Sequence, residues 1–169
     1  TGLVAQANCT TCPEGHACRE GASAPEPCSP GSAAPDAGMD VCGKCSPGSF
    51  MNVSGQSSCF DCPAGACCDE GATAAQPCPG GTFSAVTGRP SESDCSPCPA
   101  GAFCFAGSTA ATNCSKGTYA AAQRSQLCTA CPEGKYQGEE GVSACTECDD
   151  GFTCPEGSVM QIPLSCEPG

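Results

Sequence analysis

Basic side chains, histidine and tryptophan are scarce in this chain of 169 residues. It has six lysines and arginines against eighteen aspartates and glutamates, a net charge of −12, one histidine and no tryptophan. The chain offers no basic patch that could neutralise phosphates, which argues against nucleic-acid binding. The single histidine, His16, has no second acid or base beside a nucleophile. The sequence therefore predicts no catalytic residue and no enzyme activity.

Large apolar side chains are also rare. Leu, Ile, Val and Phe together make about one residue in ten, whereas a packed core usually needs about twice that share. No apolar run approaches membrane-spanning length, and no basic-then-apolar leader begins the chain. With this composition alone, the chain would be expected to stay disordered.

Cysteine reverses that expectation, because the chain has 21 cysteines, 22 glycines and 16 prolines. A disulfide that closes a loop of about 15 residues stabilises a fold by roughly 3 kcal/mol in the chain-entropy model. Several such loops can offset the ordering cost of a chain without a core. We expect a small disulfide-rich fold: an extended linear array of cystine-stapled loops with short β-hairpins, almost no helix and no large hydrophobic core. Disulfides at this density indicate an extracellular location.

The cysteines recur after 86 residues. Cysteines 9, 12, 18, 28, 42, 45, 59, 62 and 68 return at 95, 98, 104, 114, 128, 131, 145, 148 and 154, and Cys78 returns at Cys166 with a slip of two. This period predicts two repeat blocks, residues 1–94 and 95–169, in a linear array. Cys9 is placed like the closing cysteine of a loop and Cys166 like an opening one. We therefore expect the sequence to be an excerpt of a longer array, cut at both ends.

Two loop types alternate within each block, one with thirteen or sixteen residues between its cysteines and one with five. Joining each loop to itself predicts nine disulfides: Cys12–Cys18, Cys28–Cys42, Cys45–Cys59, Cys62–Cys68, Cys78–Cys95, Cys98–Cys104, Cys114–Cys128, Cys131–Cys145 and Cys148–Cys154. This consecutive-loop scheme leaves over Cys9, Cys67 and Cys166. Spacing alone cannot fix a connectivity.

Two other uses of the cysteines remain open. Crossed pairing would join Cys9 to Cys18 and Cys12 to Cys28, and would force bonds between Cys42 and Cys45 and between Cys128 and Cys131. The spacing from Cys42 to Cys62, and again from Cys128 to Cys148, also resembles a four-cysteine zinc ribbon. Zinc ribbons usually carry basic residues in the turns between their cysteines, and these are missing here. The chain also has pairs of adjacent acidic residues, but they lack the alternating oxygen ligands of a calcium loop. We predict no metal and no cofactor.

Secondary structure should be thin, because Gly and Pro interrupt every window of about ten residues. Short strands are expected at residues 49–53, 82–86 and 118–121, as hairpins within their own loops. An aromatic residue lies five positions after most long-loop openers, at Phe50, Phe83, Tyr119 and Tyr136. Each ring is expected to cover its own or the neighbouring disulfide.

Three N-glycosylation sequons begin at Asn8, Asn52 and Asn113. Two of them carry a cysteine in the middle, where fast disulfide formation could suppress glycosylation. Asn52 is therefore the best candidate.

The loop motif resembles the ephrin-receptor-like cysteine-rich repeats, which are similar in style to tumour necrosis factor receptor and epidermal-growth-factor-like modules. The matching segments are Cys78-Pro-Gly-Gly-Thr-Phe83, Cys114-Ser-Lys-Gly-Thr-Tyr119 and Cys131-Pro-Glu-Gly-Lys-Tyr136. The resemblance implies an extracellular, extended and non-enzymatic array. The composition is similar to that of proteins from GC-rich algal genomes, and long arrays of this kind resemble the glycoproteins of flagellar mastigonemes.

These observations favour a structural spacer in a secreted filament or cell-surface glycoprotein, on the cell or flagellar surface. The alternative is the ligand-binding ectodomain of a receptor, in which a few exposed side chains carry recognition. Expected partners are copies of the chain, a companion glycoprotein and glycans, without nucleic acid or membrane insertion. Cys67 is either a covalent link to another chain on an exposed loop or a buried thiol.

Overall fold

The computed structural model describes residues 11–164. Asn8, Cys9 and Cys166 lie outside these residues, so the expectations about them stay predictions. Within the described part, no helix is long and apolar enough to cross a membrane.

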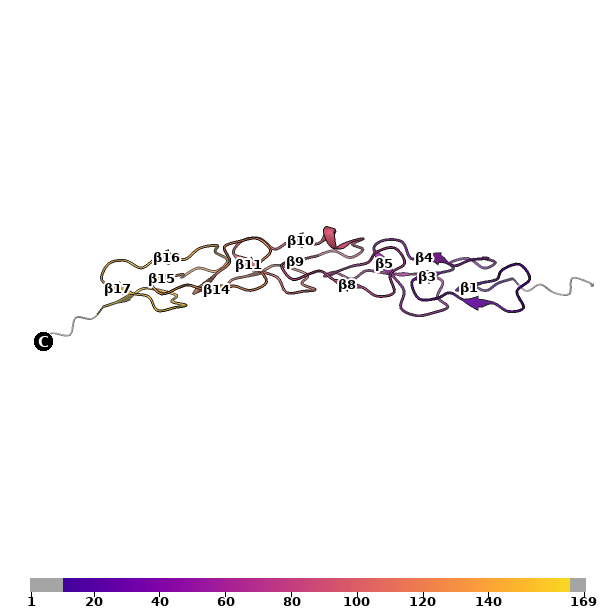
Figure 1. Ribbon diagram of the computed structural model, residues 1–169, viewed down its shortest axis with the longest axis horizontal. Helices are drawn as coiled ribbons and strands as arrows, with labels where there is room; N and C mark the ends of the chain where they lie inside the picture. Colours follow the sequence, from indigo (N-terminus) through magenta and orange to yellow (C-terminus); the bar gives the residue numbers. More distant parts are fainter. Residues whose placement is uncertain (1–10, 165–169) are drawn as a thin grey trace, which may run out of the picture. The chain divides into compact units, whose positions relative to one another are not determined.

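Residues 11–164 form short strands of two residues each, joined in order into nine two-stranded sheets, together with one 3₁₀ turn (Figure 1). The elements are β1 (His16–Ala17), β2 (Glu26–Pro27), β3 (Ser32–Ala33), β4 (Gly43–Lys44), β5 (Ser49–Phe50), β6 (Phe60–Asp61), β7 (Ala66–Cys67), β8 (Gln76–Pro77), β9 (Thr82–Phe83), η1 (Glu92–Asp94), β10 (Ser96–Pro97), β11 (Ala102–Phe103), β12 (Thr112–Asn113), β13 (Thr118–Tyr119), β14 (Thr129–Ala130), β15 (Lys135–Tyr136), β16 (Thr146–Glu147), β17 (Phe152–Thr153) and β18 (Ile162–Pro163).

Each hairpin starts with a tight turn directly after an opening cysteine. In the turn Ser29-Pro30-Gly31-Ser32, the Ser32 N–H donates to the Ser29 carbonyl at 3.1 Å, and the Ser32 hydroxyl donates to the same oxygen at 2.7 Å. Proline presets the second position of such a turn, and Gly31 has φ +83° at the third, as a type II turn requires. The turn leads into β3, which pairs with β4 in an antiparallel arrangement with Ser32 opposite Lys44.

The structure contains nine disulfides among residues 11–164, and their pairs are those of the consecutive-loop scheme. Cys18 bonds to Cys12, which excludes the crossed pairing. The cysteines of the two ribbon-like sets are all disulfide-bonded, so the zinc-ribbon alternative is wrong. The loop from Cys78 to Cys95 has sixteen residues instead of thirteen between its cysteines, and it is the loop that contains η1.

The strands begin where they were expected but are shorter. β5, β9 and β13 start at Ser49, Thr82 and Thr118, and each ends after two residues. Beyond β5, the Met51 N–H donates to the carbonyl of Ala72 at 3.0 Å, so this backbone bonds to a later loop and leaves its own hairpin. The expectation that each strand pairs within its own loop is wrong, because the partner strand lies just past the closing cysteine: Phe50 pairs with Phe60, after Cys59.

Cystines, alanines and one methionine fill the interior. Met51 and most of the opening cysteines are at most 1% exposed. The prediction for the aromatic residues is confirmed at Phe83, which packs against the buried residues Cys98, Ala102 and Cys104. Phe50 instead contacts the ring of Phe60, with centroids 6.1 Å apart.

The residues group into two compact units. Among the described residues, the first contains residues 11–62, 68–76 and 88–91, and the second contains residues 63–67, 77–87 and 92–164. These units are defined by contacts in space, whereas the blocks 1–94 and 95–169 are defined by the 86-residue period of the sequence. The two blocks therefore remain a prediction. The elongated shape expected from the repeat also remains a prediction.

Candidate functional site

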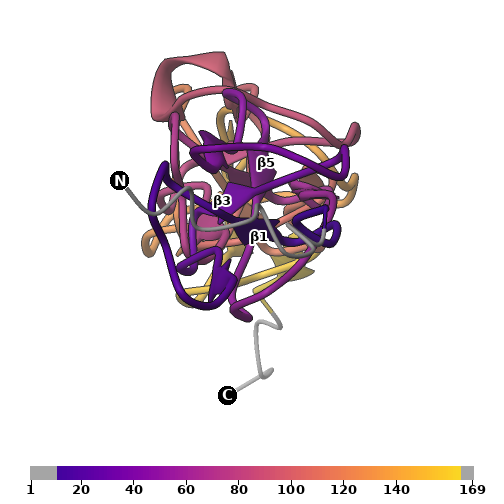
Figure 2. The same cartoon turned by 90° about the vertical axis from the view of Figure 1, so that its right-hand side faces the viewer.

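The repeated structural feature of the chain is the contact between one loop and the loops that follow it. In the first unit, the Gly15 N–H donates to Ala34 O at 2.9 Å, and the Gly31 N–H donates to Met51 O at 2.8 Å. These bonds join β1 to the β3 loop and the β3 loop to the β5 loop. In Figure 2 the three strands lie one behind the other. Each hairpin therefore uses its backbone to hold the next one.

A second contact reaches the loop after next and requires glycine. A Cβ atom placed on Gly117, whose φ is +77°, would lie 2.3 Å from the carbonyl oxygen of Gly157. The same close approach of 2.1 to 2.4 Å recurs at seven turn glycines, whose covering residues follow forty to forty-three positions later: Gly15 under Gly55, Gly31 under Gly71, Gly48 under Gly88, Gly65 under Gly107, Gly81 under Arg124, Gly101 under Gly141 and Gly117 under Gly157. Any side chain at these positions would hold two loops apart.

Arg124 is the exception in this series. It is the one residue other than glycine with positive φ in the described part of the chain, at +64°, and its carbonyl covers Gly81. The residue 86 positions earlier is Gly38, with φ +86°. An L-residue in this region costs about 1–2 kcal/mol. Nothing in residues 11–164 explains the arginine.

A buried glutamine supports one loop from inside, and the sequence analysis did not identify it. Gln137 is 9% exposed. Its Nε2 donates to Ala144 O at 3.0 Å, and its Oε1 accepts from the Glu139 N–H at 2.9 Å. These two bonds hold the loop between Cys131 and Cys145. Nothing in the sequence predicts these two hydrogen bonds, except that Gln137 directly follows the aromatic residue Tyr136.

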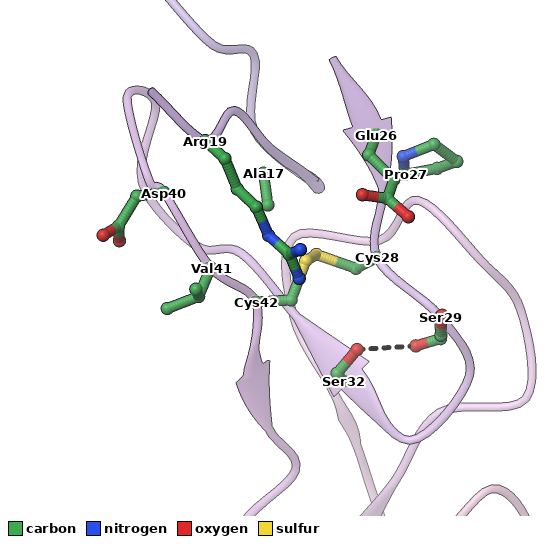
Figure 3. Close-up of a pocket in the computed structure, with 10 residues that line it drawn as sticks. All are labelled: Ala17, Arg19, Glu26, Pro27, Cys28, Ser29, Ser32, Asp40, Val41 and Cys42. Carbon is green, nitrogen blue, oxygen red and sulfur yellow. Dashed lines mark hydrogen bonds between the residues drawn. A yellow bond between two sulfur atoms is a disulfide. The ribbon is translucent and has the colours of Figure 1, made fainter. Parts of the chain in front are cut away.

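A shallow hollow lies over the Cys28–Cys42 disulfide. Figure 3 shows the Arg19 side chain extending toward this disulfide, between Glu26 and Asp40. No nucleophile with an adjacent base is found among the residues that line the hollow. His16 lies in β1, where its Nδ1 contacts Glu14 O at 3.1 Å; because a carbonyl only accepts, Nδ1 carries the proton. Between residues 11 and 164, no three His, Cys, Asp or Glu side chains could hold a metal ion together.

Two ion pairs lie on the described surface. Lys44 Nζ is 3.7 Å from Glu70 Oε1, and Lys135 Nζ is 2.6 Å from Glu147 Oε1. The hydrogen bond and the charge of Glu147 raise the pKa of Lys135. Both pairs are solvated and contribute little to stability. Because the chain has so few basic residues, most of its carboxylates contribute to a negative surface.

Cys67 lies in β7 as a buried thiol with 6% of its surface exposed. The sequence interpretation that placed it on an exposed loop, available for a bond to another chain, is therefore wrong about its exposure. Of the two expectations, the structure favours the buried thiol. The equivalent strand positions Ala17, Phe103 and Thr153 show that the hairpin does not need a cysteine here.

The two sequons within the described residues have different surroundings. Asn52 is exposed and lies between β5 and β6, with Val53 51% exposed beside it. Asn113 lies in β12 opposite Ala102, and its amide approaches Gly141 so closely that a Cβ there would be 3.2 Å from Nδ2. Cys114, the middle residue of that sequon, is buried and bonded to Cys128.

We expect glycopeptide mass spectrometry of the secreted protein to find N-glycan on Asn52 and none on Asn113. A glycan on Asn113 would have to displace the amide from Gly141, whereas Asn52 meets no such obstacle. In a chain whose third sequon is removed by Asn8→Gln, Asn52→Gln should therefore abolish the mass shift removed by peptide-N-glycosidase F, and Asn113→Gln should leave it unchanged. A shift that survives Asn52→Gln would contradict this expectation.

The comparison with protein families gives one partial match. Residues 117–161, about a quarter of the chain, match the family described as "Tyrosine-protein kinase ephrin type A/B receptor-like". A search of curated proteins found no match. The matched stretch contains the hairpins from β13 to the turn before β18. Cysteine-rich segments of this type are extracellular and non-catalytic. Together with the nine disulfides, the match identifies a cysteine-rich repeat of receptor-like or structural kind.

Proposed function

We propose that the chain is a structural spacer segment of a secreted filament or cell-surface glycoprotein, which assembles through protein–protein contacts. A filament such as a flagellar mastigoneme is the setting that fits its composition. The observation that carries the proposal is the repeated loop contact, in which turn glycines such as Gly31 and Gly117 each receive the backbone of the loop after next. Contacts of this kind use the repeated geometry of the turns to connect loops, not to shape a binding pocket.

Linear arrays in which each element contacts only near neighbours gain or lose whole repeats without a change of fold. A spacer should therefore tolerate the loss of one complete period. A receptor would lose the few exposed side chains in which its recognition resides. The two functions predict different outcomes for the same deletion.

The test is deletion of residues 28–113 from the full-length secreted protein. The deletion removes one 86-residue period, joins Pro27 to Cys114, and takes out five complete disulfides. We expect the variant to be secreted with all remaining disulfides closed and to enter its extracellular assembly. Deletion of residues 35–113 is the control. It also removes Asn52 and Asn113, but it breaks the loop from Cys28 to Cys42 and should be retained in the cell.

A period-deleted protein that is secreted and fully oxidised but no longer assembles would overturn the spacer proposal. That result would favour the ligand-binding ectodomain. Failure of both deletions to leave the cell would also contradict the proposal, because an intact repeat frame would then not be sufficient for folding.

A further inference from the structure

The last hairpin of the described chain exposes a stripe of large apolar side chains. Met160, in the bend before β18, is 65% exposed, and Ile162, in β18, is 48% exposed. Gln161, between them, bonds to the other arm of the hairpin: its Nε2 donates to Asp149 Oδ2 at 2.9 Å, and its Oε1 accepts from the Asp149 N–H at 3.1 Å. The Gln161 side chain is thus held by the hairpin, while the apolar side chains on either side of it in the sequence, Met160 and Ile162, are open to solvent.

The stripe is particular to this hairpin and does not follow from the frame. Three other hairpins have the same design, and each is followed by further loops. Their residues at the position of Met160 are Ala24, Ala74 and Ala110, and at the position of Ile162 they are Glu26, Gln76 and Thr112; all six are exposed. The frame thus keeps these two positions in solvent even inside the array. Only the hairpin of β17 and β18 fills them with large apolar side chains.

An open, acidic hollow adjoins the stripe. Thr153, the strand partner of Ile162, lines a hollow of about 570 Å³ together with Tyr119, Pro132, Glu133, Pro155 and Glu156. Neither ion pair of residues 11–164 involves Glu133 or Glu156. Residues 148–164 include two further exposed acids, Asp149 and Asp150, and no lysine or arginine. Two carboxylates beside a tyrosine ring form a favourable environment for a Lys or Arg side chain.

We infer that the stripe and the hollow form a docking surface for an extended segment of a companion protein that carries Lys or Arg beside large apolar residues. The apolar side chains of the segment cover Met160 and Ile162, and its cation enters the hollow between Glu133 and Glu156. A second copy of the chain is disfavoured as the occupant, because each copy carries a net charge of −12. Exposed apolar area with a charged rim is the arrangement expected of a protein interaction site.

This inference rests on the proposed function only in assuming that the chain acts by contacting other proteins, and its test is separate. The period deletion leaves residues 148–164 in place, so the two can fail independently. The probes are a short synthetic peptide that alternates valine with lysine and the same peptide with glutamate in place of lysine. Their affinities for the intact secreted chain are measured by calorimetry at low and high salt.

We expect the lysine peptide to bind, more weakly at high salt, and the glutamate peptide not to bind. Met160→Ala with Ile162→Gln, which installs the residues of the β8 hairpin, should weaken binding at least about tenfold. Glu133→Gln with Glu156→Gln should weaken it comparably. The matched control keeps Met160 and Ile162 and adds Ala74→Met with Gln76→Ile, which places a second apolar pair on the β8 hairpin and should leave the affinity unchanged.

Equal binding of both peptides, or an affinity unaffected by the Met160 and Ile162 changes, would overturn the inference. If the control variant gains binding as strong as the native site, then general apolar adhesion is the cause and the site is not specific. If the intact chain instead self-associates, and the Met160 and Ile162 changes abolish this, then the occupant is a second copy and the assignment of a basic partner is wrong.

Discussion

Gly117→Ala is expected to destabilise the protein much more than Gly107→Ala. Both glycines have nearly the same conformation, with φ +77° and +78°, so both substitutions incur the cost of about 1–2 kcal/mol for an L-residue in the left-handed region. The new methyl group at Gly117 would lie 2.3 Å from Gly157 O, whereas at Gly107 the nearest atom, Pro77 Cβ, would lie at an ordinary contact distance of 3.5 Å. Relieving that overlap requires a backbone shift, which adds about 1–3 kcal/mol or more.

The comparison is made with disulfides intact, by guanidinium unfolding and by the amount of oxidised protein secreted. Hydrogen exchange should show the reason, because the amide protons of Gly117 and Gly141 lie in the bonds that connect these loops: Gly117 N–H donates to Gln137 O, and Gly141 N–H donates to Cys114 O. Their protection should fall in the Gly117 variant and persist in the Gly107 variant. Equal destabilisation by both substitutions would show that the close contact does not matter and that only the backbone conformation does.

Removal of the Cys45–Cys59 disulfide, by Cys45→Ala with Cys59→Ala, should cost about 3 kcal/mol, the value expected for a loop of this length. The interior consists largely of the cystines themselves, so little apolar packing remains to hold the opened loop. The Cys45 backbone also accepts from the Gly71 N–H and donates to Gly31 O, which links the loop to its neighbours. We expect fast proteolysis confined to residues 45–71.

The control for this prediction is Ser46→Ala with Ser58→Ala. These serines are exposed, lie one position inside the two cysteines, and leave the disulfide in place. They should change neither stability nor the cleavage pattern. A Cys45 and Cys59 variant as resistant to protease as the native chain would mean that loop contacts, and not the cross-link, hold this region.

Sequence reasoning reached the local part of the fold, because that part depends on residues close together in the chain. The opening cysteine, the glycine of the turn and the closing cysteine lie within one loop, so their spacing predicts where a strand begins, as at Ser49 and Thr118, although the partner strands lie past the closing cysteines. The ends of these strands could not be predicted in the same way. β5 ends before Met51 because the Met51 N–H donates to the carbonyl of Ala72, which belongs to another loop.

The contacts between loops could not be predicted from cysteine spacing, because they join residues about forty positions apart in the sequence. The shared glycines revealed a common backbone conformation, but they did not reveal that Gly157 O lies over Gly117. The repeat also conceals where copies differ. Arg124 occupies a position where Gly38 stands in the first block, and its positive φ appears only in the structure. Likewise, Met160 and Ile162 indicate an interaction site only because the structure shows that the equivalent residues of the other hairpins are exposed.

The forty-residue reach of the turn glycines has a consequence for biosynthesis. A disulfide closes within its own loop, across a sequence separation of six to seventeen residues, and can form as soon as that loop is exported. The cover of Gly117, however, is made by Gly157. At a translation rate of about 5–20 residues per second, Gly157 is synthesised about 2–8 s later. Each newly oxidised loop therefore stays uncovered until about forty further residues have been synthesised, and during that interval chaperones and disulfide isomerases can reach it.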